Sequence, residues 1–522
     1  MNKFKTQKSG LLKSAAILSA FSLICKFSGM VFRLFLTGRI GAEGMGLYQL
    51  ILSVYSLFTT FATAGFSVSV SRLSAEAFEN INIDEGRKNA TKVLKTSLLL
   101  SLFIGFISSF SMLSLSGVFA KQFLNDQRTL IPLRILAFSM PFMALSSCLK
   151  GYFTAARKIS IPAAAQLFEQ IMKISITYTF MMTFMISTTD VGTLCIGIVL
   201  GLTLGEVLSF LFLYICYIFS KDRYKYWTKT DKKTIEFKRI TNVIIPIAAS
   251  SYITGILHSA ESMLIPYCFS LFGGDKAQSL AEFGLIRGMV IPTLFFPFAF
   301  LSSVISILIP EISRLNTFTD KTRRDEKIQK ILRITYIFSI AAGGIFFFMP
   351  EHISLIFYNN NDSVYAFKLL ALVTPFMYIE TISDGILKGI GHQIFTMKTS
   401  IINSVSRILI IVLLIPKTGT NGYLWLLIIS NMFAYFMCAY KLNRATTVRI
   451  GLKTSVLPFV YTALSGLAVQ NLLNKLVLKS TLLEGIIGII VYIGIYGLLY
   501  LFTYKYDYKH NKISSEKYSF FN

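Results

Sequence analysis

Charged side chains are scarce in this sequence of 522 residues. Asp, Glu, Lys and Arg make up 15% of the chain, whereas a typical soluble domain carries about 25%. Hydrophobic residues make up 54%, and the mean hydropathy is +0.61. The apolar residues come in runs of about 20 or more, the length that crosses roughly 30 Å of hydrocarbon. We therefore expect an integral membrane protein rather than a chain of soluble domains.

Motifs of enzymes and of metal sites are also missing. The sequence has no phosphate-binding P-loop, no G-x-S-x-G nucleophile motif and no H-E-x-x-H metal motif. The six cysteines include no C-x-x-C pair and no spacing with histidine that suits zinc, so they are expected to fill space in the core. We predict neither an enzyme nor a cofactor or metal site. The histidines are too few and too scattered for a catalytic cluster: His258, His352, His392 and His510.

Acidic residues are few compared with basic ones, 26 against 51, which gives a net charge of +25. A nucleic-acid partner is not expected, because the basic residues form short clusters between apolar runs and no basic domain. Two such clusters are 221–239 and 314–333, whereas loops such as 358–363 are nearly free of cations. Positive charge collects on the cytoplasmic side of membrane proteins. This asymmetry predicts that both termini lie in the cytoplasm.

Fourteen apolar runs are long enough to be transmembrane helices. No connection between them is long enough for a soluble catalytic domain. The predicted spans are 14–37, 45–71, 96–118, 129–149, 159–187, 191–220, 240–269, 280–309, 334–357, 363–387, 394–416, 420–440, 454–474 and 481–504.

Part of the sequence is duplicated. The segment LRILAFSMPFMALSSCLKG (133–151) resembles FKLLALVTPFMYIETISDGILKG (367–389), and both contain Pro-Phe-Met and end on Leu-Lys-Gly. The match pairs the fourth predicted span with the tenth, so the fold is expected to contain two parallel six-helix repeats and two added C-terminal helices. The expected parts are an N-terminal lobe (1–220), a cytoplasmic basic linker (221–239), a C-terminal lobe (240–443), helices 13 and 14 (444–505) and a cytoplasmic tail (506–522).

Cations inside apolar runs are candidates for a binding site, because a charge in hydrocarbon is expensive. Lys26 and Arg33 are seven residues apart and share one face of the first span. Arg287 occupies the corresponding region of the eighth span. Facing one another, these cations would suit a phosphate or carboxylate. The alternative is that the arginines extend to the headgroups or pair with Glu261 and Glu282.

Other ionisable residues within the spans have two readings each. His258 and Glu261 share a face of the seventh span and are candidates, together with Glu282, for ion coupling or gating, or else form a buried pair. Glu169 and Lys173 are four residues apart and are expected to neutralise each other. Arg407 is a further cation within a span, for which the sequence indicates no partner.

Several segments carry a resemblance to a known family. FSGMVFRLFLTGRIGAEGMGLYQL, FATAGFSVSVSRLSAE and LKGYFTAARKISIPAAAQLFEQ are similar to the stage V sporulation protein B family. That family belongs to the multidrug/oligosaccharidyl-lipid/polysaccharide exporter superfamily, which also contains lipid II flippases. The resemblance extends over essentially the whole chain.

This resemblance implies a V-shaped two-lobe transporter that works by alternating access on a lipid-linked saccharide. It also implies that Lys26, Arg33 and Arg287 engage a pyrophosphate, and that helices 13 and 14 form a groove for the lipid tail. One feature departs from the flippases, which carry a cation on the second helix. The stretch from Gly46 to Ser71 has none, so the cargo of this protein could differ.

The leading hypothesis is a flippase that moves a polyprenyl-pyrophosphate-linked peptidoglycan or polysaccharide precursor across the bacterial cytoplasmic membrane, for spore cortex synthesis. Its expected partners are the lipid-linked oligosaccharide, membrane lipids and cell-wall synthases. One alternative is a cation-coupled multidrug exporter of the same superfamily, with Glu261 holding the drug. Another is a membrane scaffold for cell-wall synthases that transports nothing and depends on the basic loops instead.

Overall fold

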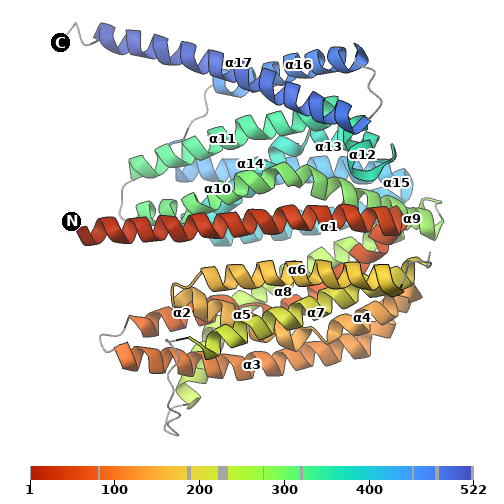
Figure 1. The fold of residues 1–522 in the computed structure, drawn as a ribbon, viewed down its shortest axis with the longest axis vertical. Helices are drawn as coiled ribbons and strands as arrows, with labels where there is room; N and C mark the ends of the chain where they lie inside the picture. Colours follow the sequence, from red (N-terminus) through yellow and green to blue (C-terminus); the bar gives the residue numbers. More distant parts are fainter. Residues whose placement is uncertain are drawn as a thin grey trace. The chain divides into compact units, whose positions relative to one another are not determined.

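The computed structural model describes residues 2–79, 83–184, 190–220, 233–273, 275–317, 321–448, 452–475 and 481–518. Every regular element within these ranges is a helix, which confirms the predicted all-α fold class (Figure 1).

The helices follow one another closely along the chain. The first part contains α1 (Asn2–Thr63), α2 (Phe66–Phe78), α3 (Ile83–Val118), the π-helical turn η1 (Phe119–Phe123), the 3₁₀ turn η2 (Gln127–Thr129), α4 (Leu130–Ala137), α5 (Met140–Ala155), α6 (Ser160–Phe184), α7 (Val191–Ile218), α8 (Lys233–Leu271), α9 (Lys276–Phe283) and the π-helical turn η3 (Gly284–Val290). The second part contains α10 (Ile291–Thr317), α11 (Lys321–Phe348), α12 (Pro350–Tyr358), α13 (Val364–Ala371), α14 (Thr374–Gly389), α15 (Gln393–Ala445), α16 (Leu452–Lys475) and α17 (Thr481–Tyr518).

The helices have the length and composition of membrane spans. Within the described ranges, nine helices are long and apolar enough to cross a membrane, and the number is eleven if each of two bent helix pairs forms one span. The protein is thus a multi-pass, all-α membrane protein, as the sequence indicates. The number of fourteen spans stays a prediction.

Two of these helices are far longer than a bilayer requires. The stretch Ser19–Phe78, which takes in most of α1 and all of α2, has 60 residues, and α15 has 53. About 20 residues are enough to cross the hydrocarbon. Each is kinked at a glycine with positive φ, Gly41 (φ 64°) and Gly419 (φ 58°). Residues with a Cβ are strained in this conformation, and glycine is not. Both kinks fall where the sequence predicts that one span ends and the next begins.

The duplicated sequence motif folds in the same way in both copies. The first copy forms α4 and α5, which are bent by 46° at a short break, and the second forms α13 and α14, bent by 56°. Pro141 and Pro375 are the second residues of α5 and α14. Proline suits the first turn of a helix, where its missing N–H leaves no hydrogen bond unmade. The two copies are therefore broken helices with a proline at the same position after the break.

By its internal contacts the chain divides into two compact units. Unit 1 contains residues 1–289 and 397–423, and unit 2 contains 290–396 and 424–522. The predicted lobes, linker and tail stay a prediction. Residues 221–232 of the predicted linker and 519–522 of the predicted tail lie outside the described residues.

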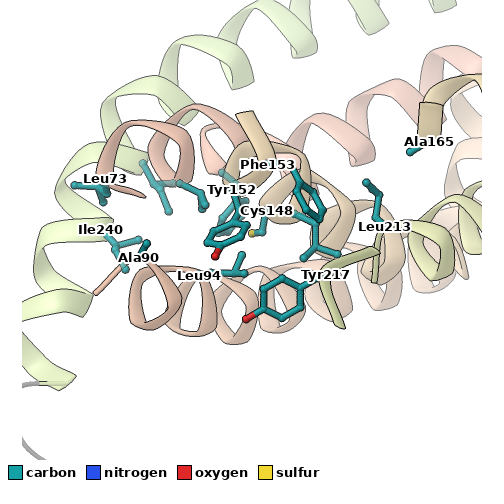
Figure 2. Close-up of a cluster of buried hydrophobic side chains, with 14 of the residues drawn as sticks. Leu73, Ala90, Leu94, Cys148, Tyr152, Phe153, Ala165, Leu213, Tyr217 and Ile240 are labelled. Carbon is teal, nitrogen blue, oxygen red and sulfur yellow. The ribbon is translucent and has the colours of Figure 1, made fainter. Parts of the chain in front are cut away.

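Buried aromatic and aliphatic side chains hold the helices of unit 1 together (Figure 2). Tyr152 of α5 is fully buried and meets Tyr217 of α7 edge-on, with 5.6 Å between the ring centroids. Cys148, one turn before Tyr152, is buried in the same cluster. Most of the cysteines fill the core, as the sequence predicts: Cys148, Cys195, Cys268 and Cys438 are buried.

Candidate functional site

A buried carboxylate held by two arginines lies in unit 1, on helices apolar enough to cross a membrane. Glu261 of α8 is fully buried. Arg287 of η3 and Arg407 of α15 each donate a hydrogen bond from Nη2 to the same oxygen of Glu261, Oε1. The pairing lowers the cost of placing these charges in hydrocarbon. Of the alternatives that the sequence leaves open for Arg287, the structure shows the pair with Glu261.

Arg287 lies in a π-helical turn that packs against α1. Such turns occur often at functional sites. A Cβ on Gly284, the first residue of η3, would strike the carbonyl oxygen of Ala42 and lie 2.9 Å from the Cα of Gly46. Glycine at both positions lets the two backbones touch. This close approach holds the segment that carries Arg287 against the helix that carries Arg33 and Lys26.

The structure brings Arg33 to the residue next to Arg287. Arg33 donates a hydrogen bond from Nη1 to the carbonyl oxygen of Gly288, at 2.9 Å. The Arg33 side chain is half-buried, and Lys26, two turns earlier on α1, is exposed. Arg33 and Arg287 thus meet at one short stretch of η3, whereas Lys26 lies two turns before Arg33 on α1.

The cluster around Glu261 has more positive charge than negative. Two guanidinium groups face one carboxylate, which leaves one positive charge in excess. Four buried polar atoms in or beside the cluster have no hydrogen-bond partner by the distances among the described residues: Glu261 Oε2, Arg287 Nε, Arg407 Nε and the hydroxyl of Tyr423, which faces Arg287. Buried polar atoms are paired in the large majority of cases, so this set is incomplete.

In the described part of the chain, neither of the two other candidates for coupling or gating takes part in the ion pairs of the arginine cluster. His258 is on α8, one turn before Glu261, and its side chain is exposed. Glu282 of α9 accepts hydrogen bonds from the hydroxyl of Thr420 and from Gln278 Nε2, the latter at 3.4 Å. The structure therefore joins Glu261 directly to the arginines. His258 lies near enough for its ring to interact electrostatically with Glu261, Arg287 and Arg407, whereas Glu282 is bound by Thr420 and Gln278.

Arg407 is the residue of this cluster for which the sequence indicates no role. It stands alone in an apolar run, and its partner Glu261 is 146 residues away in the chain. The duplicated motif gives no further clue, because its offset is 238 at Lys150 and Lys388, and in that register Arg407 corresponds to Glu169.

A second group of intramembrane charges lies on α5 and α6. Glu169 forms an ion pair with Lys150, with 3.8 Å between Oε2 and Nζ. The ammonium group of Lys173 lies over the ring of Phe32, 5.8 Å from its centroid. The structure thus gives Glu169 an ion-pair partner on α5, and the charges of Glu169 and Lys173 also interact, as the sequence predicts.

Unit 2 contains an apolar cavity of about 750 Å³ that is partly open at the surface. It is lined by α10, α11, α12 and α17, mainly by aromatic and aliphatic side chains such as Phe296, Phe338, Ile345 and Tyr496. The family resemblance implies a lipid groove at the two predicted C-terminal spans, 454–474 and 481–504. In the structure, α17 contains the predicted fourteenth helix, and the helices that complete the cavity with it are α10, α11 and α12.

The chain is similar in sequence and in fold to known membrane proteins. The model of the polysaccharide biosynthesis protein family matches residues 11–316. Stage V sporulation protein B of Bacillus subtilis is 23% identical over 467 residues, which cover 88% of each chain. The lipid II flippase MurJ of Bacillus subtilis is 21% identical over 495 residues, again 88% of each chain. The solved structure of a lipid II flippase MurJ in an inward closed conformation has a TM-score of 0.73 and 14% identity, covering 94% of this chain and 98% of that chain. These matches confirm the resemblance seen in the sequence.

Proposed function

Because the chain belongs to the family of polysaccharide biosynthesis proteins, we propose that it is a flippase of the bacterial cytoplasmic membrane. Its cargo is a polyprenyl-pyrophosphate-linked peptidoglycan or polysaccharide precursor, which it moves outward by alternating access. Its setting is the synthesis of the spore cortex, and its partners are the cell-wall synthases that use the precursor. The sequence similarity to stage V sporulation protein B and to MurJ supports this cargo and setting.

The observation that carries the proposal is the excess positive charge inside the membrane. Arg287 and Arg407 share the single carboxylate of Glu261. Arg33 donates a hydrogen bond to the carbonyl oxygen of Gly288, the residue after Arg287. Guanidinium groups match phosphate oxygens in geometry and in charge. An anionic head group that enters this region would satisfy the excess charge, which an uncharged cargo could not do.

The apolar cavity of unit 2 supports the lipid part of the proposal. Its lining is largely hydrocarbon, so it suits an isoprenoid chain and not a sugar. We propose that this cavity takes up part of the polyprenyl tail of the cargo.

A cation-coupled drug exporter fits the site less well. Such a protein would need a carboxylate free to hold the cationic drug, and Glu261 is the best candidate on the sequence. In the structure two arginines already occupy that carboxylate. The arrangement favours an anionic cargo.

Reconstituted flipping tests the proposal. Proteoliposomes with the full chain should move a lipid-linked peptidoglycan precursor to the outer leaflet, measured with a reagent that reacts only with exposed head groups. Arg287→Ala and Arg33→Ala should each slow the movement about tenfold or more, since each removes a charge-assisted contact. The exposed arginine change Arg72→Ala is the control. Normal flipping by both site variants at normal protein abundance would show that the proposed site is wrong.

A further inference from the structure

The two arginines do not use the Glu261 carboxylate as fully as its geometry allows. A carboxylate can accept a forked pair of hydrogen bonds from one guanidinium, one on each oxygen. Arg287 and Arg407 instead both donate to Oε1, and Oε2 has no partner among the residues that the structure describes. The carboxylate therefore holds both cations through one atom.

A surface carboxylate of the same unit gives a direct contrast. Glu76 of α2 also binds two arginines, and each has an oxygen of its own. Arg72 Nε lies 3.2 Å from Oε1, and Arg239 Nη2 lies 2.6 Å from Oε2. There both oxygens are paired although water is near. At Glu261, which is fully buried, only one of the two oxygens is paired with the arginines.

The unpaired atoms indicate what would fit the arginines better. The Nε atoms of Arg287 and Arg407 are buried donors without an acceptor in the described part of the chain. A diphosphate offers several acceptor oxygens and more than one negative charge. It can give each guanidinium its own oxygens and neutralise the charge that one carboxylate leaves over.

We propose that Glu261 is an internal counter-anion, which the diphosphate of the cargo displaces from Arg287 and Arg407. Arg407 is then a further cargo-binding residue, and Glu261 takes the place of the diphosphate when no cargo is bound. This inference rests on the proposed function, because it takes a diphosphate-linked lipid as the cargo. The return of the carboxylate keeps the arginines from being left unpaired, and thereby favours release of the cargo.

Two substitutions that should change the affinity in opposite directions test this competition. Glu261→Gln removes the competitor, so the purified full chain should bind undecaprenyl diphosphate about tenfold more tightly. Arg407→Gln removes a ligand and should weaken binding by a similar factor. Glu76→Gln, the matched change at a carboxylate shared by two arginines, should leave the Kd unchanged. If the ion pair served only to stabilise the structure, both site variants would bind undecaprenyl diphosphate more weakly, and that result would overturn the proposal.

Two further probes separate the possible sources of the anion. Undecaprenol, which has no phosphate, should bind to Glu261→Gln and to the wild type with the same Kd. Inorganic pyrophosphate should bind more tightly to Glu261→Gln than to the wild type, by a smaller factor than undecaprenyl diphosphate does. If Glu261→Gln tightened and Arg407→Gln weakened the binding of pyrophosphate but not of undecaprenyl diphosphate, the assignment of the site to the cargo would be overturned.

The double variant keeps the test valid if Glu261→Gln alone does not fold. Its two changes, Glu261→Gln and Arg407→Gln, leave a single uncompensated charge on Arg287. Its affinity for undecaprenyl diphosphate should exceed that of Arg407→Gln alone, and an equal or lower affinity would refute displacement. A wild type that binds this lipid but moves no lipid-linked precursor would contradict the proposed function, and leave the inference about Glu261 to the binding data.

Discussion

Single residues in the site can act through charge or through hydrogen bonds, and Arg33 can separate the two. Its guanidinium donates to the carbonyl oxygen of Gly288, so it could serve only to tie α1 to η3. Its charge, however, adds to the positive region around Arg287. The proposed function requires the charge.

Replacing Arg33 by Lys and by Gln distinguishes these roles. Lys keeps the charge, whereas Gln keeps an N–H donor for Gly288 and loses the charge. We expect Arg33→Lys to retain most of the flipping rate and Arg33→Gln to lose about tenfold or more, because a charged donor to phosphate is worth about twice a neutral one. Flipping rates in proteoliposomes measure this. Normal activity in the Gln variant would show that Arg33 acts only through its hydrogen bond to Gly288.

The sequence could identify Arg33, Arg287 and Glu261 as candidates, because each is a charge within an apolar run. It could not show which of them meet. Glu261 is 26 residues from Arg287 and 146 from Arg407, and such contacts depend on how the helices pack. No local pattern carries that information.

At the scale of helices, the contact between α1 and η3 depends on glycine. Gly46 and Gly284 allow the two backbones to touch, and Arg33 spans the same contact a little further along. The kink at Gly41 lies just before this contact on α1. The sequence predicted a break near Gly41 because the apolar run pauses there, but not that the next turn packs against η3.

A methyl group at Gly284 should therefore disturb the site. Its Cβ would meet the backbone of Ala42 and Gly46, which cannot rotate away as a flexible side chain can. We expect Gly284→Ala to lower the melting temperature and the flipping rate together. Gly38→Ala, also on α1, is the control, since a Cβ there has open space and alanine favours a helix by up to about 1 kcal/mol. Equal effects of the two substitutions would rule out the close contact as the cause.

At the scale of the whole molecule, the charge asymmetry predicts the orientation in the membrane. The all-α class, the resemblance to known transporters and the duplication of the motif all follow from patterns along the chain. The division into units does not, because residues 397–423 join unit 1 through contacts with distant helices.

Cysteine labelling tests the orientation. In a background without the half-buried Cys25 and Cys216, an impermeant maleimide added to intact cells should label Asn361→Cys and spare Arg323→Cys. The first position lies in a loop predicted outside and the second in a basic cluster predicted inside. After permeabilisation both should react. The reverse pattern in intact cells would place the termini outside.

The π-helical turn η3 has a consequence for how this protein could change over generations. A π turn holds one residue more than an α-helical turn, and each residue rotates a helix by about 100°. Loss of a single residue beside Arg287 would let the turn relax to a regular α-helix and swing the arginine away from Glu261, with the charge content of the chain unchanged. The position of Arg287 is thus encoded in the length of the segment as well as in its residues, so a deletion can move the arginine even when every side chain of the site is retained.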